Sequence, residues 1–485
     1  MSGPLVAPGW QAPSDFSQFR VHMVGIGGSG MAGLAALLLR RGARVSGTDR
    51  EPSAALARLA ERGAHVSTRQ VAESLPADVD VVVASAAIPP QHAELVEAAR
   101  RAIPVIKYAQ LLGALMARHD GIAVAGTHGK STTAAWLTFV LRKAGLDPSF
   151  VIGAEVPQLG GGSGVGDGPH FVAEACEYDR SFHNLRPRSA VVLNIEEDHL
   201  DCYRDLAAIA ESFARFAALV PPDGLLVLNG QDANCQALAR RLAQAGGPAR
   251  SGPVVETFGV QATDVWRSCD AVLRDGRYEF TLLRNGAPLG RVHLGISGLH
   301  NVSNALAVTA LATRAGAPWE AIRAGLQEFL GARRRLQVQG VVAGVTVADD
   351  YAHHPTEIRA TLRAARERFN PRRLWCIFQP HQHSRTRFLL AEFARSFAAA
   401  DHIVVPDIYF VRDSERERQA ICAADLVERV QALGGQAVHI PDFDAIVRTL
   451  VQHVEPGDLV LTMGAGDIWK VADELVRRLG AHRPQ

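Results

Sequence analysis

The stretch that decides the fold is GTHGKSTT, residues 126–133. It follows the apolar run Ile122 to Ala125, which predicts a buried strand, and it precedes residues 134–143, which are typical of an amphipathic helix. Backbone N–H groups at such a turn, together with the helix N-terminus, favour bound anions. Lys130 would bring a positive charge to the β- and γ-phosphates of a nucleotide, and the Ser131 hydroxyl would bind Mg²⁺. The stretch therefore predicts a phosphate loop.

The spacing of this loop differs from the common phosphate-binding pattern. G-x-x-G-K-S replaces G-x-x-x-x-G-K-[ST], and Val124 stands where the first glycine is expected. The shorter loop indicates a distinct class of nucleotide-hydrolysing enzyme. The alternative is a glycine-rich turn capped by Thr or Ser.

Composition indicates a soluble protein of several domains. The chain has 485 residues, of which 47% are hydrophobic and 21% charged, and this length predicts two to four domains. The net charge of +1 gives no general attraction to nucleic acid or to an acidic membrane, so we expect neither partner. The chain has only four lysines, and one of them, Lys130, lies in the glycine loop.

The six cysteines indicate a reducing compartment. They are scattered, with no C-x-x-C pair and no zinc-like spacing. The first residues lack a basic segment followed by an apolar one, and no uncharged apolar run could cross a bilayer. We expect a cytoplasmic protein.

Strand-like and helix-like runs alternate from Val21 onward, which predicts an α/β fold with parallel sheets. Three blocks can be separated: the first includes Val21–Val24, Val45–Thr48 and Val79–Val83; the second starts near Gly121 and includes a strand at Ala190–Ile195; the third includes Leu374–Phe378, His402–Val405 and Leu459–Thr462.

Two connecting segments stand out between these runs. The glycine-rich stretch at residues 160–168 predicts a flexible surface connection. Residues 331–335, GARRR, are the expected junction between the second and third blocks, and their three arginines could also be a solvated charge run.

A second glycine loop, residues 25–30 (GIGGSG), matches G-x-G-x-x-G. It follows a predicted strand, opens a predicted helix and is followed by Asp49, which is the spacing of a dinucleotide-binding site. An NAD-dependent oxidoreductase is therefore a rival hypothesis, although it gives no role to the loop at 126–133. The third reading is a tight turn that needs small residues for packing.

Charged and imidazole side chains follow several predicted strands. Residues 172–179 and 194–201 end in carboxylates that could reach the phosphate loop and hold Mg²⁺. In the third block, residues 349–357 and 378–387 are rich in His and Arg, which suits a substrate carboxylate. The His353-His354 pair could bind metal, but no further Cys or His supplies a zinc-like set here. Each segment alone could be a helix cap or a solvated loop.

Taken together, seven segments resemble the Mur ligases, and most closely their alanine-adding branch: GIGGSGM, GTHGKSTT, EACEYDRSF, NIEEDHLDCY, GLHNVSNALAV, DDYAHHPTEI and FQPHQHSRTR. The resemblance runs from about Val21 to Val476. It implies three domains: a Rossmann-like domain at residues 1–118 for the UDP-sugar, a central P-loop ATPase-type α/β domain at 119–331, and a Rossmann-like domain at 332–485 that closes over ATP and the amino acid.

The resemblance also implies the reaction and its partners. ATP would drive the joining of L-alanine to UDP-N-acetylmuramate through an acyl phosphate, in cytoplasmic peptidoglycan precursor synthesis. The implied cofactors are ATP and Mg²⁺, with Mn²⁺ as a substitute. We expect a monomer or a weak homodimer.

Residue roles carry over position by position. The catalytic group would be Lys130, His199, His353, His381 and Arg385. The ATP-binding group would be Gly126, Thr127, His128, Gly129, Lys130, Ser131, Thr132, His300, Asn301, Asn304, Arg335 and Asp350. The UDP-sugar group would be Gly25, Gly27, Gly28, Ser29, Gly30, Met31, Asp49 and Ser85. Tyr351, His381 and Arg385 would orient the amino acid, and Ser131, Glu174 and His199 would hold metal.

The chain departs from the family pattern at several positions: Ser131 for Thr, Cys176 and Tyr178 for an acidic and a small polar residue, Leu336 for Phe, Gln382-His383 for Arg-Tyr, and residues 410–413. It has no lysine between 144 and 469, so the carbamylated lysine of other Mur ligases is absent there. The departures affect the expected substrate preference more than the reaction class. The related ligase that attaches a tripeptide to the same sugar nucleotide, and an inactive nucleotide-binding regulator, are further alternatives.

Overall fold

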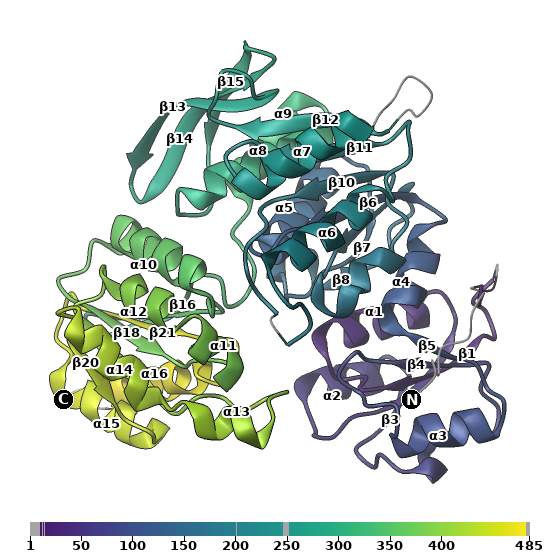
Figure 1. Cartoon of the computed structure of the whole chain (residues 1–485), viewed down its shortest axis with the longest axis horizontal. Helices are drawn as coiled ribbons and strands as arrows, with labels where there is room; N and C mark the ends of the chain where they lie inside the picture. The colour runs from purple at the N-terminus through teal and green to yellow at the C-terminus, as the bar shows by residue number, and fades with distance from the viewer. Residues whose placement is uncertain (1–9, 12, 14, 200, 246–251, 482–485) are drawn as a thin grey trace.

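The computed structural model describes residues 10–481 except 12, 14, 200 and 246–251. Its strands form three sheets. Each sheet and its helices form one group along the chain: the first is coloured purple, the second teal, and the third green to yellow (Figure 1). The predicted α/β class with three sheet-based blocks is confirmed. No described helix is both long and apolar enough to cross a membrane.

The first sheet is parallel with the strand order β3-β2-β1-β4-β5. Its elements are β1 (Arg20–Val24), α1 (Ser29–Arg40), β2 (Arg44–Thr48), α2 (Ala54–Glu61), β3 (His65–Ser67), β4 (Val81–Ala84), α3 (Ala93–Arg100), β5 (Val105–Lys107) and α4 (Tyr108–Met116). The strand order reverses between β1 and β4, and the first glycine loop follows β1 at this point. Ligands of open α/β sheets bind at such a switch point.

The second sheet has the order β15-β14-β13-β12-β11-β10-β6-β9-β7-β8. Its strands are β6 (Asp120–Ala125), β7 (Ser149–Val151), β8 (Ser163–Gly164), β9 (His170–Glu174), β10 (Ser189–Val192), β11 (Leu225–Asn229), β12 (Val254–Gly259), β13 (Trp266–Arg274), β14 (Arg277–Arg284) and β15 (Ala287–His293). The helices are α5 (Lys130–Lys143), α6 (Leu206–Ala217), α7 (Ala233–Ala245), α8 (His300–Arg314) and α9 (Trp319–Glu328). The antiparallel β13–β14 hairpin extends toward α10 (Pro355–Phe369) of the third group (Figure 1).

The third sheet has the order β16-β17-β21-β18-β19-β20, parallel except for β16. Its strands are β16 (Gln337–Val342), β17 (Val345–Asp350), β18 (Leu374–Phe378), β19 (His402–Val405), β20 (Ala437–His439) and β21 (Leu459–Met463). Besides α10 its helices are α11 (His383–Phe388), α12 (Leu390–Ala394), α13 (Glu415–Ala420), α14 (Ala423–Ala432), α15 (Phe443–His453) and α16 (Trp469–Ala481).

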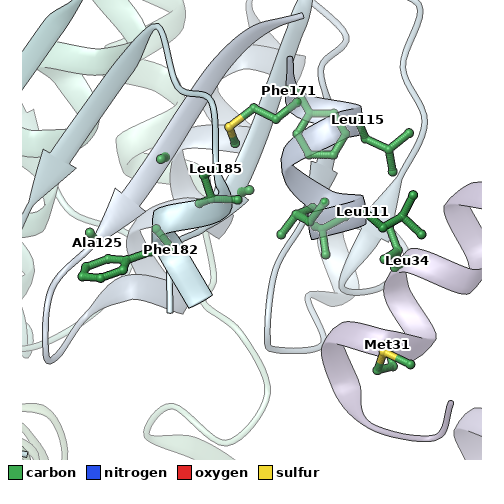
Figure 2. Packing of buried hydrophobic residues seen from close by; sticks show 14 of the residues in the cluster. Met31, Leu34, Leu111, Leu115, Ala125, Phe171, Phe182 and Leu185 are labelled. Carbon is green, nitrogen blue, oxygen red and sulfur yellow. The ribbon is translucent and has the colours of Figure 1, made fainter. Parts of the chain in front are cut away.

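The first two sheets share one hydrophobic core. Leu34 of α1 and Leu111 of α4 belong to the same buried cluster as Phe171 of β9 and Phe182 (Figure 2). The clusters on the two faces of the third sheet contain no residue before Leu336. Hydrophobic burial therefore joins the first two groups, whereas the third group has cores of its own.

The prediction of a flexible surface connection is wrong for residues 163–168 of the glycine-rich stretch. Residues 163–164 form β8, which pairs with β7 at an edge of the second sheet. A Cβ on Gly164 would lie 2.4 Å from the Phe150 ring, and a Cβ on Gly168 would lie 1.9 Å from the Leu146 carbonyl oxygen. Gly164 and Gly168 therefore permit close packing, and residues 163–168 are not a flexible connection, whereas a Cβ on Gly160 or Gly161 would meet no atom within 4 Å.

The predicted strand at Ala190–Ile195 is shorter than expected. β10 ends at Val192, after which Leu193 N donates to Ala125 O and Asn194 O accepts from Thr127 N. The backbone beyond β10 thus supports the phosphate loop.

Candidate active site

The loop at residues 126–131 connects β6 to α5, as its sequence predicts. Gly126 and Gly129 have φ values of 144° and 82°, which side chains rarely adopt. A Cβ on Gly126 would also lie 2.9 Å from Leu193 Cβ. The loop therefore needs both glycines to turn into α5, whose N-terminus favours an anion.

Lys130 is held inside this loop. Its Nζ donates to Gly126 O at 2.6 Å and to Thr127 O at 3.0 Å, and it lies 2.9 Å from Glu177 Oε2. Burial lowers the pKa of Lys130, but the charge of Glu177 more than offsets this and leaves the pKa above its ordinary value. The ammonium therefore stays charged beside the turn.

Oxygen donors lie next to Lys130. Ser131 Oγ donates to both oxygens of Glu174 at 3.0 and 2.9 Å, and Gly153 N donates to Glu174 Oε2 at 2.7 Å. His199 Nε2 lies 3.5 Å from Glu177 Oε1. His199 Nδ1 is buried and has no hydrogen-bond partner among the described residues. The predicted metal-binding residues thus lie close to Lys130 and its partner Glu177.

A cavity of about 500 Å³ lies on one side of the loop. Eight of the residues predicted to bind ATP line it: His128, Gly129, Thr132, His300, Asn301, Asn304, Arg335 and Asp350. Asn301 Nδ2 donates to Ser297 O, and Asn304 Nδ2 donates to Asn301 Oδ1, so both amides are fixed. Residues of the second and third groups together form this cavity.

A second cavity of about 710 Å³ touches all three groups. Gly30 and Tyr108 line it from the first, Lys130 and Ser131 from the second, and Tyr351 with other residues from the third. This cavity brings the two glycine loops to one space.

The residues predicted to bind the UDP-sugar follow β1, β2 and β4. Gly27 N donates to Asp49 Oδ2 at 2.7 Å, so Asp49 supports the loop, and Gly25 faces Ser85, because a Cβ on Gly25 would lie 3.1 Å from Ser85 Cβ. Gly28 and Ser29 lie at the start of α1. The Met31 side chain is 4% exposed and packs in the shared core (Figure 2), so a contact with the UDP-sugar at this position would come from the backbone.

Asp350 and Tyr351 lie at the end of β17. Asp350 accepts hydrogen bonds from Leu336 N at 2.6 Å and Ala352 N at 2.8 Å, and burial raises its pKa to about 6. The guanidinium groups of Arg334 and Arg335 lie 5.1 and 5.3 Å from the centre of the Tyr351 ring.

The arginine run is not only a solvated charge run. Arg334 Nε donates to the buried Asp349 at 2.8 Å, and Arg335 lines both cavities. Arg333 is more than half exposed.

The His and Arg side chains of the third group meet the second group. Arg385 donates to Asp198 Oδ1 at 2.8 and 3.0 Å, and both side chains are buried. His381 Nδ1 lies 3.3 Å from Arg385 Nη1, and the His381 ring stacks on Tyr409. Burial, reinforced by the positive charges nearby, lowers the pKa of His381 to about 2. His353 Nδ1 lies 3.2 Å from Glu357 Oε2.

Tyr178 and His383, two of the departures from the family pattern, contact residues 410–413, where the chain also departs from that pattern. The Arg412 guanidinium lies 4.6 Å from the centre of the Tyr178 ring. His383 N donates to Asp413 Oδ2, and the His383 ring contacts that of Phe410. These substitutions therefore meet at one place between the second and third groups.

Sequence reasoning missed five residues of this region as individual site residues: Glu177, Glu196, Asp198, His354 and Glu357. All five lie in segments whose chemistry it noted. Their importance comes from partners far along the chain, such as Arg385 for Asp198. The sequence carries no direct signal for such pairings.

Three family models match the chain in order. The model described as "Mur ligase family, catalytic domain" matches residues 20–120, "Mur ligase middle domain" matches 124–312, and "Mur ligase, glutamate ligase domain" matches 334–466.

Curated relatives match almost the full chain. A UDP-N-acetylmuramate–L-alanine ligase of Caldanaerobacter subterraneus subsp. tengcongensis is 41% identical over 95% of this chain and 98% of its own length. A ligase with the same name from Salinibacter ruber is 42% identical over 95% of both chains.

Solved structures show the same architecture. The UDP-N-acetylmuramate-alanine ligase of Thermotoga maritima has a TM-score of 0.80 at 26% identity and covers 96% of this chain and 100% of its own. A murein peptide ligase of Psychrobacter arcticus has a TM-score of 0.70 at 25% identity, with the same coverage of both chains.

Proposed function

Because this chain belongs to the Mur ligase family, we propose that it joins L-alanine to UDP-N-acetylmuramate at the expense of ATP. The observation that carries the proposal is the cavity of about 710 Å³, where the two glycine loops and the Tyr351 region meet. Such a meeting point suits a reaction of three substrates. The identity to alanine-adding relatives over 95% of the chain supports alanine as the amino acid.

The reaction needs the substrate carboxylate to be activated, because a carboxylate is a poor acyl donor. In the proposed sequence the muramoyl carboxylate attacks the γ-phosphate of ATP, ADP leaves, and an acyl phosphate forms. The amino group of alanine then attacks the acyl carbon, and phosphate leaves from the tetrahedral intermediate. Lys130 would offset the charge of the migrating phosphoryl group.

The donor set beside Lys130 fits a divalent cation. Ser131 and Glu174 offer the oxygen ligands that Mg²⁺ prefers, and the buried Nδ1 of His199 has no hydrogen-bond partner among the described residues. When bound, Mg²⁺ or Mn²⁺ would offset charge on the phosphate oxygens. We propose that Ser131 and Glu174 hold one ion and that His199 serves a second.

The remaining assignments divide between the cavities. The cavity of about 500 Å³ would hold the nucleoside of ATP against His300, Asn301 and Asn304. The first glycine loop would hold the UDP part, supported by Asp49. Tyr351, Arg385 and His381 would orient alanine. With a pKa of about 2, His381 would act as a neutral hydrogen-bonding group and not as a base near pH 7.

The family's three-domain division fits the positions of the sheets. The described strands lie at residues 20–107, 120–293 and 337–463, so the proposed boundaries after residues 118 and 331 cut none of them. We further propose a cytoplasmic enzyme, since its substrates are nucleotides, and a monomer or weak homodimer.

Phosphate release tests this function. The full chain would be assayed with ATP, Mg²⁺ and UDP-N-acetylmuramate while L-alanine, glycine, L-serine or the tripeptide is added in turn. We expect L-alanine to give the highest kcat/KM. Release that depended only on the tripeptide would favour the recycling activity, and no dependence on any acceptor would overturn the ligase assignment.

The same samples test the oxidoreductase alternative, which the curated relatives do not favour. An oxidoreductase would change NAD(P)H absorbance without consuming ATP. We expect no such change.

A further inference from the structure

Two histidines and a glutamate meet at the edge of the nucleotide cavity. His128 lies in the phosphate loop, Glu196 follows β10, and His354 is the N-cap residue of α10. One candidate ligand atom from each lies within 4.8 Å of the other two. Folding thus brings His354 of the His353-His354 pair together with two potential ligands that are distant from it in the sequence.

The distances between these side chains are long for hydrogen bonds. Glu196 Oε2 lies 3.6 Å from His128 Nε2 and 3.9 Å from His354 Nδ1. His128 Nε2 is buried without a hydrogen-bond partner among the described residues. Two ligands at zinc's usual distance of about 2.0–2.1 Å lie about 3.4 Å apart in a tetrahedral site. The three side chains could therefore bind one ion after moving slightly closer together.

In each imidazole, the nitrogen that does not face the cluster lies near an oxygen that can accept its hydrogen and so orient the ring. His128 Nδ1 lies 3.3 Å from Glu357 Oε1, and His354 Nε2 lies 3.2 Å from the carbonyl oxygen of Glu197. Metal-binding histidines typically donate their second N–H to a carboxylate or a carbonyl oxygen. His354 Nδ1 accepts a helix-capping bond from Thr356 N at 3.3 Å, which an ion bound at this nitrogen would replace. Binding of an ion would therefore release the proton of His128 and break the bond from Thr356 N to His354 Nδ1.

We propose that His128, Glu196 and His354 form a binding site for one divalent transition-metal ion, with Zn²⁺ as the best match. Two imidazoles and a carboxylate suit zinc, whereas Mg²⁺ prefers oxygen ligands such as those of Ser131 and Glu174. His128 and Glu196 line the nucleotide cavity, so the fourth coordination position would open toward it.

A bound ion at this site would inhibit the enzyme. It would tie the phosphate loop and the end of β10 to α10, and so hold the third group against the second. It would also occupy the edge of the cavity proposed for ATP. Zn²⁺ and ATP should therefore compete, and Mg²⁺ at the Ser131–Glu174 set should not replace the zinc.

Cobalt absorbance of the full chain without nucleotide tests the site directly. We expect one Co²⁺ per chain with the visible bands of a tetrahedral nitrogen and oxygen set, no thiolate charge-transfer band, and displacement by Zn²⁺. Glu196→Gln keeps an acceptor for the Thr356 hydroxyl, and His354→Asn keeps a helix-capping side chain. Each variant should weaken binding by about tenfold or more, because each removes a ligand.

Two control variants separate this site from its surroundings. Glu197→Gln makes the same charge change one residue away at an exposed side chain, and His199→Gln removes the imidazole of the other proposed metal set. Both should bind Co²⁺ as the unmodified chain does, and thermal unfolding would confirm that all variants are folded. The proposal is overturned if the unmodified chain binds no Co²⁺ tetrahedrally, or if His199→Gln loses the signal and Glu196→Gln keeps it.

Discussion

At the scale of single residues, Lys130 serves both the proposed chemistry and the stability of the phosphate loop. Lys130→Ala should lower kcat by about 10²–10³-fold or more, because it removes a charge directed at the transferred phosphoryl group. It should also destabilise the fold by about 3–5 kcal/mol, because the Glu177 carboxylate is left buried without its partner. Phosphate release and urea unfolding measure the two effects.

The double variant Lys130→Ala/Glu177→Gln separates these effects. It removes the unpaired charge, so most of the lost stability should return while turnover stays low. Recovery of turnover would show that Lys130 acts only by neutralising Glu177.

His128 should make stability depend on pH. Burial lowers the pKa of His128, but the flanking carboxylates of Glu196 and Glu357 raise it to about 9, above its ordinary value of 6.5. Because the folded chain binds this proton more tightly, the stabilisation is complete below about pH 6.5 and is lost as pH rises through about 9. Urea unfolding from pH 6.5 to 9.5 should show this loss. His128→Gln should show a smaller one, and identical pH profiles would contradict the assignment.

At the scale of elements, the glycine-rich stretch gives a prediction about β8 and the turn that follows it. Gly168→Ala should destabilise the protein by about 1–3 kcal/mol, because the new Cβ would overlap the Leu146 carbonyl oxygen, a backbone atom that cannot rotate away. Gly480→Ala near the end of α16 adds the same atom in open space and should be neutral or slightly stabilising. Equal unfolding midpoints for the two variants would show that residues 163–168 can shift without cost.

Local patterns predicted most of these elements. The run from Ile122 to Ala125 lies in β6, and the loop after it opens α5, because strand, turn and helix signals are adjacent in sequence. The glycines at 160–168 misled the prediction, since composition alone does not distinguish flexibility from close packing. Burial of the Met31 side chain likewise depends on which face of α1 is covered, and the sequence alone does not give this. Pairs such as Asp198–Arg385 join residues 187 positions apart, and no spacing rule links them.

At the scale of the whole molecule, the distribution of cores indicates which parts can move. The first two sheets share a hydrophobic cluster, whereas the third sheet has separate clusters and meets the second group through polar contacts. These contacts include Asp198 with Arg385, the Tyr278 hydroxyl with Glu367, and His354 with the carbonyl oxygen of Glu197. Charged and hydrogen-bonded interfaces of this kind permit relative motion of domains. We therefore expect the third group to move as a unit.

The Asp198–Arg385 pair should control that motion. Asp198→Asn leaves the Arg385 charge buried without a partner, which costs about 3–5 kcal/mol and favours an open arrangement in which Arg385 is hydrated. Small-angle scattering should show a larger radius of gyration for this variant, and the KM for alanine should rise because Arg385 is no longer held beside His381. Glu417→Gln removes the partner of the neighbouring Arg387 on α11, where a more exposed pair contributes less than about 1 kcal/mol. That control should scatter as the unmodified chain does, and an unchanged radius for Asp198→Asn would show that other contacts hold the third group in place.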